Sequence, residues 1–239
     1  MDAESSYSGS EAPLPETLAE RSAALLQRDI LTGRLLPDSK LVISDLADSY
    51  GIGATPIREG LSRLVAQGLV IAIGQKGFRV AQVSREDLAD IIRMRSVIES
   101  EALRLSMERG GDEWEAGIVA SLHRLKRFAA RGPEVFRKEI DSFERVHKAF
   151  HTALIAACGS RRMLEQHSAL YDQTYRYRHR MLEAIPPLDD FCAEHEDLAE
   201  LAIARDAEKG GDQLCKHFAL TLTTLYPDTP AKIPTHKRR

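Results

Sequence analysis

The sequence has few cysteines, no long apolar run and no strong excess of charge of either sign. Only three cysteines occur among 239 residues, at Cys158, Cys192 and Cys215, and none forms a C-x-x-C pair. This odd, scattered set argues against a disulfide framework, so we expect reduced thiols in a cytoplasmic protein. No segment approaches the roughly 18 apolar residues that cross a bilayer. Because the N-terminus is also acidic and polar, we expect neither a signal peptide nor a membrane anchor.

The charge balance gives little indication of a partner. The formal net charge is -3, and residues 14–83 carry nearly equal numbers of acidic and basic side chains. Domains that bind nucleic acid strongly are often basic overall, so any DNA contact here must depend on a local group of cations. The hydrophobic content of 43% supports packed cores, and the length allows a small domain beside a larger one.

Residues 41–81 indicate a helix-turn-helix motif followed by a β-hairpin. Ser44 is a suitable cap for a short first helix, which Gly51 ends because glycine readily adopts the left-handed turn conformation. Thr55 and Pro56 begin the second helix, where the missing N–H of proline costs nothing. Apolar residues recur in this helix at helical spacing. That spacing leaves its other face exposed, with Thr55, Arg58, Glu59 and Ser62.

A basic hairpin follows the second helix. Two β-type segments, 69–73 and 78–83, are joined by Gly74-Gln75-Lys76-Gly77, whose glycines allow a close approach to a nucleic-acid backbone. A helix-turn-helix with such a wing places its second helix in the major groove of DNA. A helical hairpin that only packs is the alternative, but the order of the elements and the turn residues favour DNA binding. We expect double-stranded DNA to contact Arg34, Ser44, Thr55, Arg58, Lys76 and Gly77.

The rest of the chain is predicted to be helical nearly to its end. A helix at 16–32 precedes the motif, and six helices follow it at 84–109, 112–131, 133–158, 160–184, 188–206 and 211–226. Short loops predict an antiparallel all-α bundle. The expected fold class is therefore mainly α, with a winged helix-turn-helix domain at 14–83 and a six-helix bundle at 84–226. Residues 1–13 and 227–239 are expected to be disordered tails.

Four of the eight histidines are spaced as a site would require. His147 and His151 are four residues apart on one helix face, whereas His195 and His217 lie on two later helices. Helical bundles build metal sites from inward side chains of facing helices, and three or four neutral imidazoles suit Zn²⁺ or Ni²⁺. Spacing alone does not distinguish a metal-binding pair at His147 and His151 from a pair of histidines that only contact solvent. Because Lys148 follows His147, the H-E-x-x-H pattern of a zinc peptidase is absent.

The combined pattern resembles the GntR family of bacterial transcription regulators, in the FadR subfamily whose helical effector domain is called FCD. The resemblance covers residues 14–225 or so. In the N-terminal part it is carried by Gly33, Leu41, Leu46-Ala47, Pro56-Ile57-Arg58-Glu59, Leu64, Gly68-Leu69-Val70, Gly77 and Val80. In the C-terminal part it is carried by Arg95, Glu99, Phe150-His151, His195 and His217.

Two departures from the family pattern bear on the sites. The family usually has Ser-Arg before the Thr-Pro of the second helix, and its arginine contacts DNA, whereas this chain has Gly53 and Ala54. The family usually has a metal-binding aspartate where this chain has His147. Both departures, with the strings GGDEWEA at 110–116 and CGS at 158–160, resemble a branch that contains the carbon-starvation-induced repressor of the glutarate operon and regulators of hydroxyglutarate use.

The resemblance implies a dimeric repressor that a small carboxylate releases from its operator. It implies one divalent transition metal, Zn²⁺ or Ni²⁺, on His151, His195 and His217, with His147 either as the fourth ligand or turned aside. The effector, glutarate or 2-hydroxyglutarate, would lie between the metal and Arg95, and chemistry alone suggests Arg178 as a second cation. Two alternatives stay open: a metal-dependent enzyme that uses the histidines to activate water, and a regulator that senses acyl-CoA without a metal.

Overall fold

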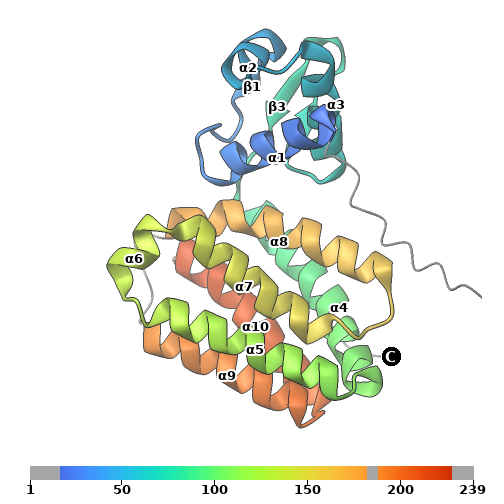
Figure 1. Cartoon of the computed structure of the whole chain (residues 1–239), viewed down its shortest axis with the longest axis vertical. Helices are drawn as coiled ribbons and strands as arrows, with labels where there is room; N and C mark the ends of the chain where they lie inside the picture. Colours follow the sequence, from blue (N-terminus) through green and yellow to red (C-terminus); the bar gives the residue numbers. More distant parts are fainter. Residues whose placement is uncertain (1–16, 182–187, 228–239) are drawn as a thin grey trace, which may run out of the picture.

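The fold is mainly α and is divided between two units with separate hydrophobic cores, as expected from the sequence (Figure 1). The computed structural model describes residues 17–181 and 188–227. The predicted tail at 1–13, residues 228–239 of the other tail and residues 182–184 of a predicted helix lie outside these ranges. Within these ranges, no helix is both long and apolar enough to cross a membrane.

The N-terminal unit combines three helices with a small sheet. The helices are α1 (Leu18–Leu31), α2 (Ile43–Tyr50) and α3 (Ala54–Ala66). The strands are β1 (Lys40–Leu41), β2 (Val70–Ala72) and β3 (Phe78–Val80), which pair antiparallel in the order β1-β3-β2. The predicted inward face of α3 is buried, and its side chains at Ile57, Leu61 and Leu64 are fully enclosed with Leu26 of α1.

The structure corrects two local expectations in this unit. Ser44 does not cap α2, because the helix begins two residues earlier than expected, at Ile43 after Val42, and the Ser44 hydroxyl donates instead to Asp45. The reason is that β1, which the sequence did not predict, ends at Leu41 and leads directly into the helix. The two predicted strands are shorter than expected, and a single 3-10 turn, Gly74–Lys76, connects them.

The C-terminal unit is an all-helical bundle. It contains α4 (Arg85–Arg109), α5 (Asp112–Ala129), α6 (Pro133–Lys138), α7 (Ile140–Ile155), α8 (Arg161–Met181), α9 (Leu188–Ile203) and α10 (Ala207–Leu225). Ser84 begins α4 as predicted, since its hydroxyl accepts the amide hydrogen of Asp87 at 3.1 Å. In Figure 1 α8 lies along the side of the bundle that faces the N-terminal unit.

Two predicted helix boundaries in the bundle are wrong. The single helix expected at 133–158 is broken at Glu139, which has a non-helical backbone and whose carboxylate binds Arg131 through both oxygens. The described part of the bundle therefore has seven helices, not six. The last helix begins at Ala207, capped by Asp206, so Gly210 and Gly211 lie inside it and do not begin it. At Gly210 the helix passes so close to α4 that a Cβ would meet Met107 Cε at 2.9 Å.

We expect Gly60→Ala and Gly117→Ala to change stability in opposite directions. A Cβ at Gly60, in α3, would lie 2.9 Å from the backbone nitrogen of Ala23 in α1, and such overpacking costs about 1–3 kcal/mol. Gly117 is an exposed position within α5 with open space around it, and alanine there is favoured by about 0.5–1 kcal/mol. Urea unfolding measures both changes. A Gly60→Ala protein as stable as the parent would contradict the close crossing of α1 and α3.

Candidate functional site

The predicted DNA-contacting side chains lie on exposed parts of the N-terminal unit. Thr55 and Arg58 are exposed on the first turns of α3, which Gly53 begins. The Arg58 guanidinium has no hydrogen-bond or ion-pair partner among the described residues. Lys76 is exposed at the end of the turn between β2 and β3, and Gly77 follows it with a φ of 91° that favours glycine. This surface offers two cations that no carboxylate of the described residues neutralises.

Arg34 and Ser44 are also exposed, but Arg34 has a neighbour inside the protein. Its guanidinium lies 3.5 Å from the buried carboxylate of Asp29, although 71% of the Arg34 side chain is exposed. Asp29 also accepts a hydrogen bond from the Tyr50 hydroxyl at 2.8 Å, which joins the ends of α1 and α2. Arg34 is therefore oriented by an anion and keeps most of its surface in solvent.

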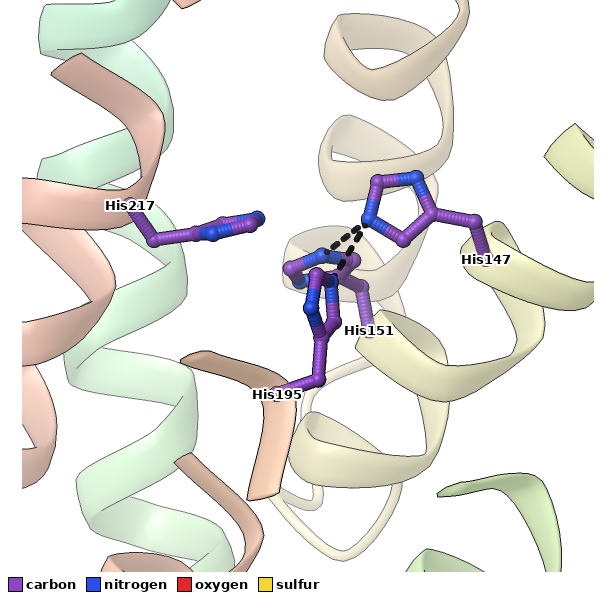
Figure 2. A group of neighbouring side chains, drawn as sticks. All are labelled: His147, His151, His195 and His217. Atoms are coloured by element: carbon purple, nitrogen blue, oxygen red, sulfur yellow. Dashed lines mark hydrogen bonds between the residues drawn. The ribbon is translucent and has the colours of Figure 1, made fainter. Parts of the chain in front are cut away.

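The four predicted histidines converge in the bundle core. His147 and His151 come from α7, His195 from α9 and His217 from α10, and their rings point toward one another (Figure 2). One ring nitrogen from each histidine lies within 4.8 Å of the others. His147 Nε2 lies 3.0 Å from Nε2 of both His151 and His195. His147, His151 and His195 are buried, whereas the His217 side chain is 12% exposed.

Hydrogen counting fixes the tautomer of His147. The Tyr171 hydroxyl lies 2.9 Å from the Glu144 carboxylate and 3.0 Å from His147 Nδ1. Glu144 has no hydrogen to donate while it pairs with Arg178, so it takes the single hydrogen of the phenol. The Tyr171 oxygen must then accept the hydrogen of His147 Nδ1. Consequently, Nε2 of His147 carries a bare lone pair that points into the cluster.

The same reasoning applies to His195 and His217. His195 Nδ1 lies 2.6 Å from the backbone oxygen of Phe191, which only accepts, so Nδ1 carries the hydrogen. His217 Nδ1 lies 3.2 Å from the carboxylate of Glu194 and is oriented in the same way. The Nε2 atoms of His147 and His195 thus face each other at 3.0 Å with no hydrogen between them. The lone pair of His147 Nε2 can accept a hydrogen from His151 Nε2, which lies 3.0 Å away, or bind a cation.

Burial keeps all four imidazoles neutral. It lowers the pKa of His195 and of His217 to about 3 and lowers the pKa of His147 and His151 well below the usual value. The positive charges of Arg95 and Arg178 contribute further to this lowering for His147 and His217. Neutral imidazoles are the state in which histidines bind a transition metal. Hydrogen bonds orient the outer nitrogens of His147, His195 and His217, whereas Nδ1 of His151 has no partner among the described residues. The residues present therefore fit one divalent ion of this class.

The two predicted effector-binding arginines are each paired with an internal glutamate. Arg95 donates through Nε and Nη2 to Glu99, at 2.6 and 3.3 Å. Arg178 donates through the equivalent atoms to Glu144, at 3.1 and 2.7 Å. Among the described residues, these bonds leave the Nη1 hydrogens of both groups for another acceptor. Both guanidinium groups lie beside the Tyr171 ring, with Cζ 5.3 Å and 4.4 Å from its centre.

Sequence reasoning missed several buried residues around the histidines. The sequence gives no signal that Tyr171 and His167 lie near the four histidines, because both are on α8, which carries none of them. Glu144 precedes His147 by three residues, but this spacing does not identify it as a partner of Tyr171. His167 is buried, and its Nδ1 lies 2.9 Å from Glu99. Burial alone would raise the pKa of Glu99, but the charges of Arg95 and His167 lower it to about 2. These partners come from different helices, so only the tertiary structure brings them together.

Comparison with protein families supports the division into two units. Residues 18–80 match the model described as bacterial regulatory proteins of the gntR family. Residues 90–220, more than half of the chain, match the FCD domain. The first match covers the helix-turn-helix and wing, and the second covers the bundle with its histidines.

Individual relatives agree with the family matches. The chain is 38% identical over 197 residues to the HTH-type transcriptional repressor GlaR of Escherichia coli, covering 81% of this chain and 89% of that protein. It is 36% identical over 218 residues to the HTH-type transcriptional regulator BphR of Paraburkholderia xenovorans, covering 90% and 89%. The solved structure of E. coli McbR has the same fold, with a TM-score of 0.74, 23% identity and coverage of 88% and 98%. The chain therefore belongs to the GntR family, as a DNA-binding transcription regulator with an FCD domain and not an enzyme.

Proposed function

We propose that the protein is a homodimeric repressor that a small dicarboxylate, glutarate or 2-hydroxyglutarate, releases from its operator. DNA binding belongs to residues 14–83, and effector binding and dimerisation belong to residues 84–226. A homodimer supplies two α3 helices for two half-sites about one DNA turn apart. Its partner is bacterial DNA, so the protein acts in the cytoplasm. The main support for the effector site is the pair of bare Nε2 atoms of His147 and His195, 3.0 Å apart.

The proposed metal site consists of His147, His151, His195 and His217. A divalent ion there would act as a Lewis acid that accepts a carboxylate oxygen of the effector. Zn²⁺ and Ni²⁺ both suit a set of imidazole nitrogens. The Glu144 and Tyr171 side chains would hold the His147 ring, and the Phe191 carbonyl would hold the His195 ring. Outer hydrogen bonds of this kind orient the ligands and increase their basicity.

The charges around the histidines support a dianion as the effector. Arg95 is balanced by Glu99, and Arg178 is balanced by Glu144, so a bound divalent ion would make the centre positive. The Glu194 carboxylate beside His217 offsets only part of the ion's charge. A dicarboxylate can supply one carboxylate to the ion, and its second carboxylate can accept hydrogens from Arg95. Phenylalanine rings also pack against the imidazoles, so it is the charged groups that favour a dicarboxylate over an acyl chain.

For the DNA-binding unit, we expect Arg58→Ala to weaken operator binding. Loss of a base contact from this exposed side chain should cost about 1–3 kcal/mol. Arg63→Ala is the matched control, because Arg63 is on the same helix but lies 3.6 Å from Glu20 of α1. Fluorescence anisotropy on a sequence selected from random DNA by the parent protein measures both affinities. Equal losses in the two variants would contradict the assigned docking of α3.

For the metal site, we expect the purified parent to bind one Zn²⁺ or Ni²⁺ ion and His195→Ala to bind none. Tyr171→Phe should keep the fold but lower metal affinity about 10–100-fold, because His147 loses the acceptor that fixes its tautomer. His123→Ala is the control, since His123 is exposed on α5. Elemental analysis and competition with a chromophoric chelator supply the data. The same metal content in the parent and in His195→Ala would show that these histidines only pack.

For the effector, we expect glutarate to bind the metal-loaded protein and to bind the chelator-treated protein much more weakly. 2-Hydroxyglutarate should bind more tightly, because its hydroxyl can also reach the ion. Arg95→Ala should weaken both, whereas Arg93→Ala should not, since Arg93 pairs with Asp90 on the exposed side of α4. Valerate, with one carboxylate, tests the second charge without changing the protein. If calorimetry shows that valerate binds as tightly as glutarate, the proposal of a dicarboxylate effector is wrong.

A further inference from the structure

Helix α8 contacts both the histidine site and the N-terminal unit. Tyr171 and Arg178 lie beside the histidines, as described above. Between them, Gln173 Nε2 donates to the backbone oxygen of Gln67, the residue that ends α3, at 2.8 Å. Arg176 Nη1 donates to the backbone oxygen of Ala81, just after β3, at 3.2 Å. One helix thus presents one set of side chains to each functional unit.

An apolar contact accompanies these hydrogen bonds. The Tyr175 side chain of α8 is 5% exposed and belongs to the hydrophobic core of the N-terminal unit. Its hydroxyl lies 2.8 Å from Asp141 of α7. Helix α3 is therefore held by more than the chain connection to α4, because its C-terminal end also contacts α8 of the bundle.

Asp172 connects the two sets of contacts. One carboxylate oxygen accepts from Lys148 Nζ of α7 at 2.7 Å, and the other accepts from Gln27 Nε2 of α1 at 2.8 Å. Lys148 follows His147, and Asp172 follows Tyr171. Two neighbouring cross-links therefore join α7 to α8. The His147–Tyr171 bond belongs to the metal site, and the Lys148–Asp172 bond extends to the N-terminal unit.

We propose that a conformational change at the histidine site is transmitted to the DNA-binding unit through these two cross-links, and that the Asp172 carboxylate links them to α1. The proposal rests on the proposed function. A ligand that shifts α7 relative to α8 at the His147–Tyr171 bond also shifts Lys148 relative to Asp172, because both bonds join neighbouring residues of the same two helices. Asp172 then changes its contact with Gln27 and shifts α1, which packs against α3. The ligand acts only through its different affinities for the two arrangements.

The test uses Gln27→Glu, which places a second carboxylate beside Asp172 and breaks the hydrogen bond between residue 27 and Asp172. Ala24→Glu is the matched control, because it adds the same charge to an exposed position of α1 one turn away. Gln27→Lys keeps a donor for Asp172 and should behave as the parent does. Amide hydrogen exchange of residues 64–69 is followed in chelator-treated protein, with Zn²⁺, and with Zn²⁺ and glutarate. Elemental analysis and calorimetry record binding separately.

We expect Zn²⁺ with glutarate to change exchange of residues 64–69 by about fivefold or more in the parent, in Ala24→Glu and in Gln27→Lys. Gln27→Glu should bind both ligands normally and lose this change. An equal change in the parent and in Gln27→Glu would overturn the proposed role of Asp172. No change in a parent that binds its ligands would overturn it as well. Failure to bind glutarate contradicts the proposed effector instead. The comparison of chelator-treated with Zn²⁺-loaded protein then tests the role of Asp172 by the same criteria. Failure to bind Zn²⁺ overturns both proposals.

Discussion

The Tyr171 hydroxyl has one hydrogen, and where that hydrogen goes determines the chemistry of the bundle core. Glu144 takes it, so the phenol oxygen accepts from His147 and leaves Nε2 of that ring as a bare acceptor. His195 has the same orientation because a backbone carbonyl holds its Nδ1 hydrogen. Since burial keeps both rings neutral, protons cannot relieve the contact between the two acceptors at neutral pH. The proposed metal site, effector and coupling to DNA all depend on this arrangement.

The charge balance around these rings explains why a neutral ligand set can suit an anionic effector. Two buried arginines would create a strongly positive interior if their charges were not balanced. Each has its own glutamate, which leaves part of every guanidinium free for a further acceptor. With four imidazoles and no carboxylate among the proposed ligands, an ion would keep its full charge for the effector. His147 thus stands where the family pattern has an anionic residue, and the carboxylate of Glu144 reaches its ring through the Tyr171 hydroxyl.

The sequence predicted much of this structure because its signals are local. The turn glycine at Gly51, the cap at Ser84 and the apolar spacing of α3 each act within a few residues, and the structure agrees with them. The four histidines could be selected because an i, i+4 pair on one helix is a local signal too. The errors at Ser44 and Glu139 and the missing strand β1 depend on contacts with other segments. The pairing of Arg95 with Glu99 is local and buried, but Glu144, Tyr171 and Asp172 gain their roles only when α7 and α8 pack together.

The most direct test of the central claim is X-ray absorption at the metal edge of the Zn²⁺-loaded protein. The account predicts a first shell that contains three to four imidazole nitrogens at about 2.0–2.1 Å, with the outer-shell scattering of histidine rings. Addition of glutarate should add an oxygen to this shell without removing imidazoles. A first shell of oxygens or sulfurs without imidazole scattering would contradict the account, because the bare Nε2 atoms of His147 and His195 would then not be ligands.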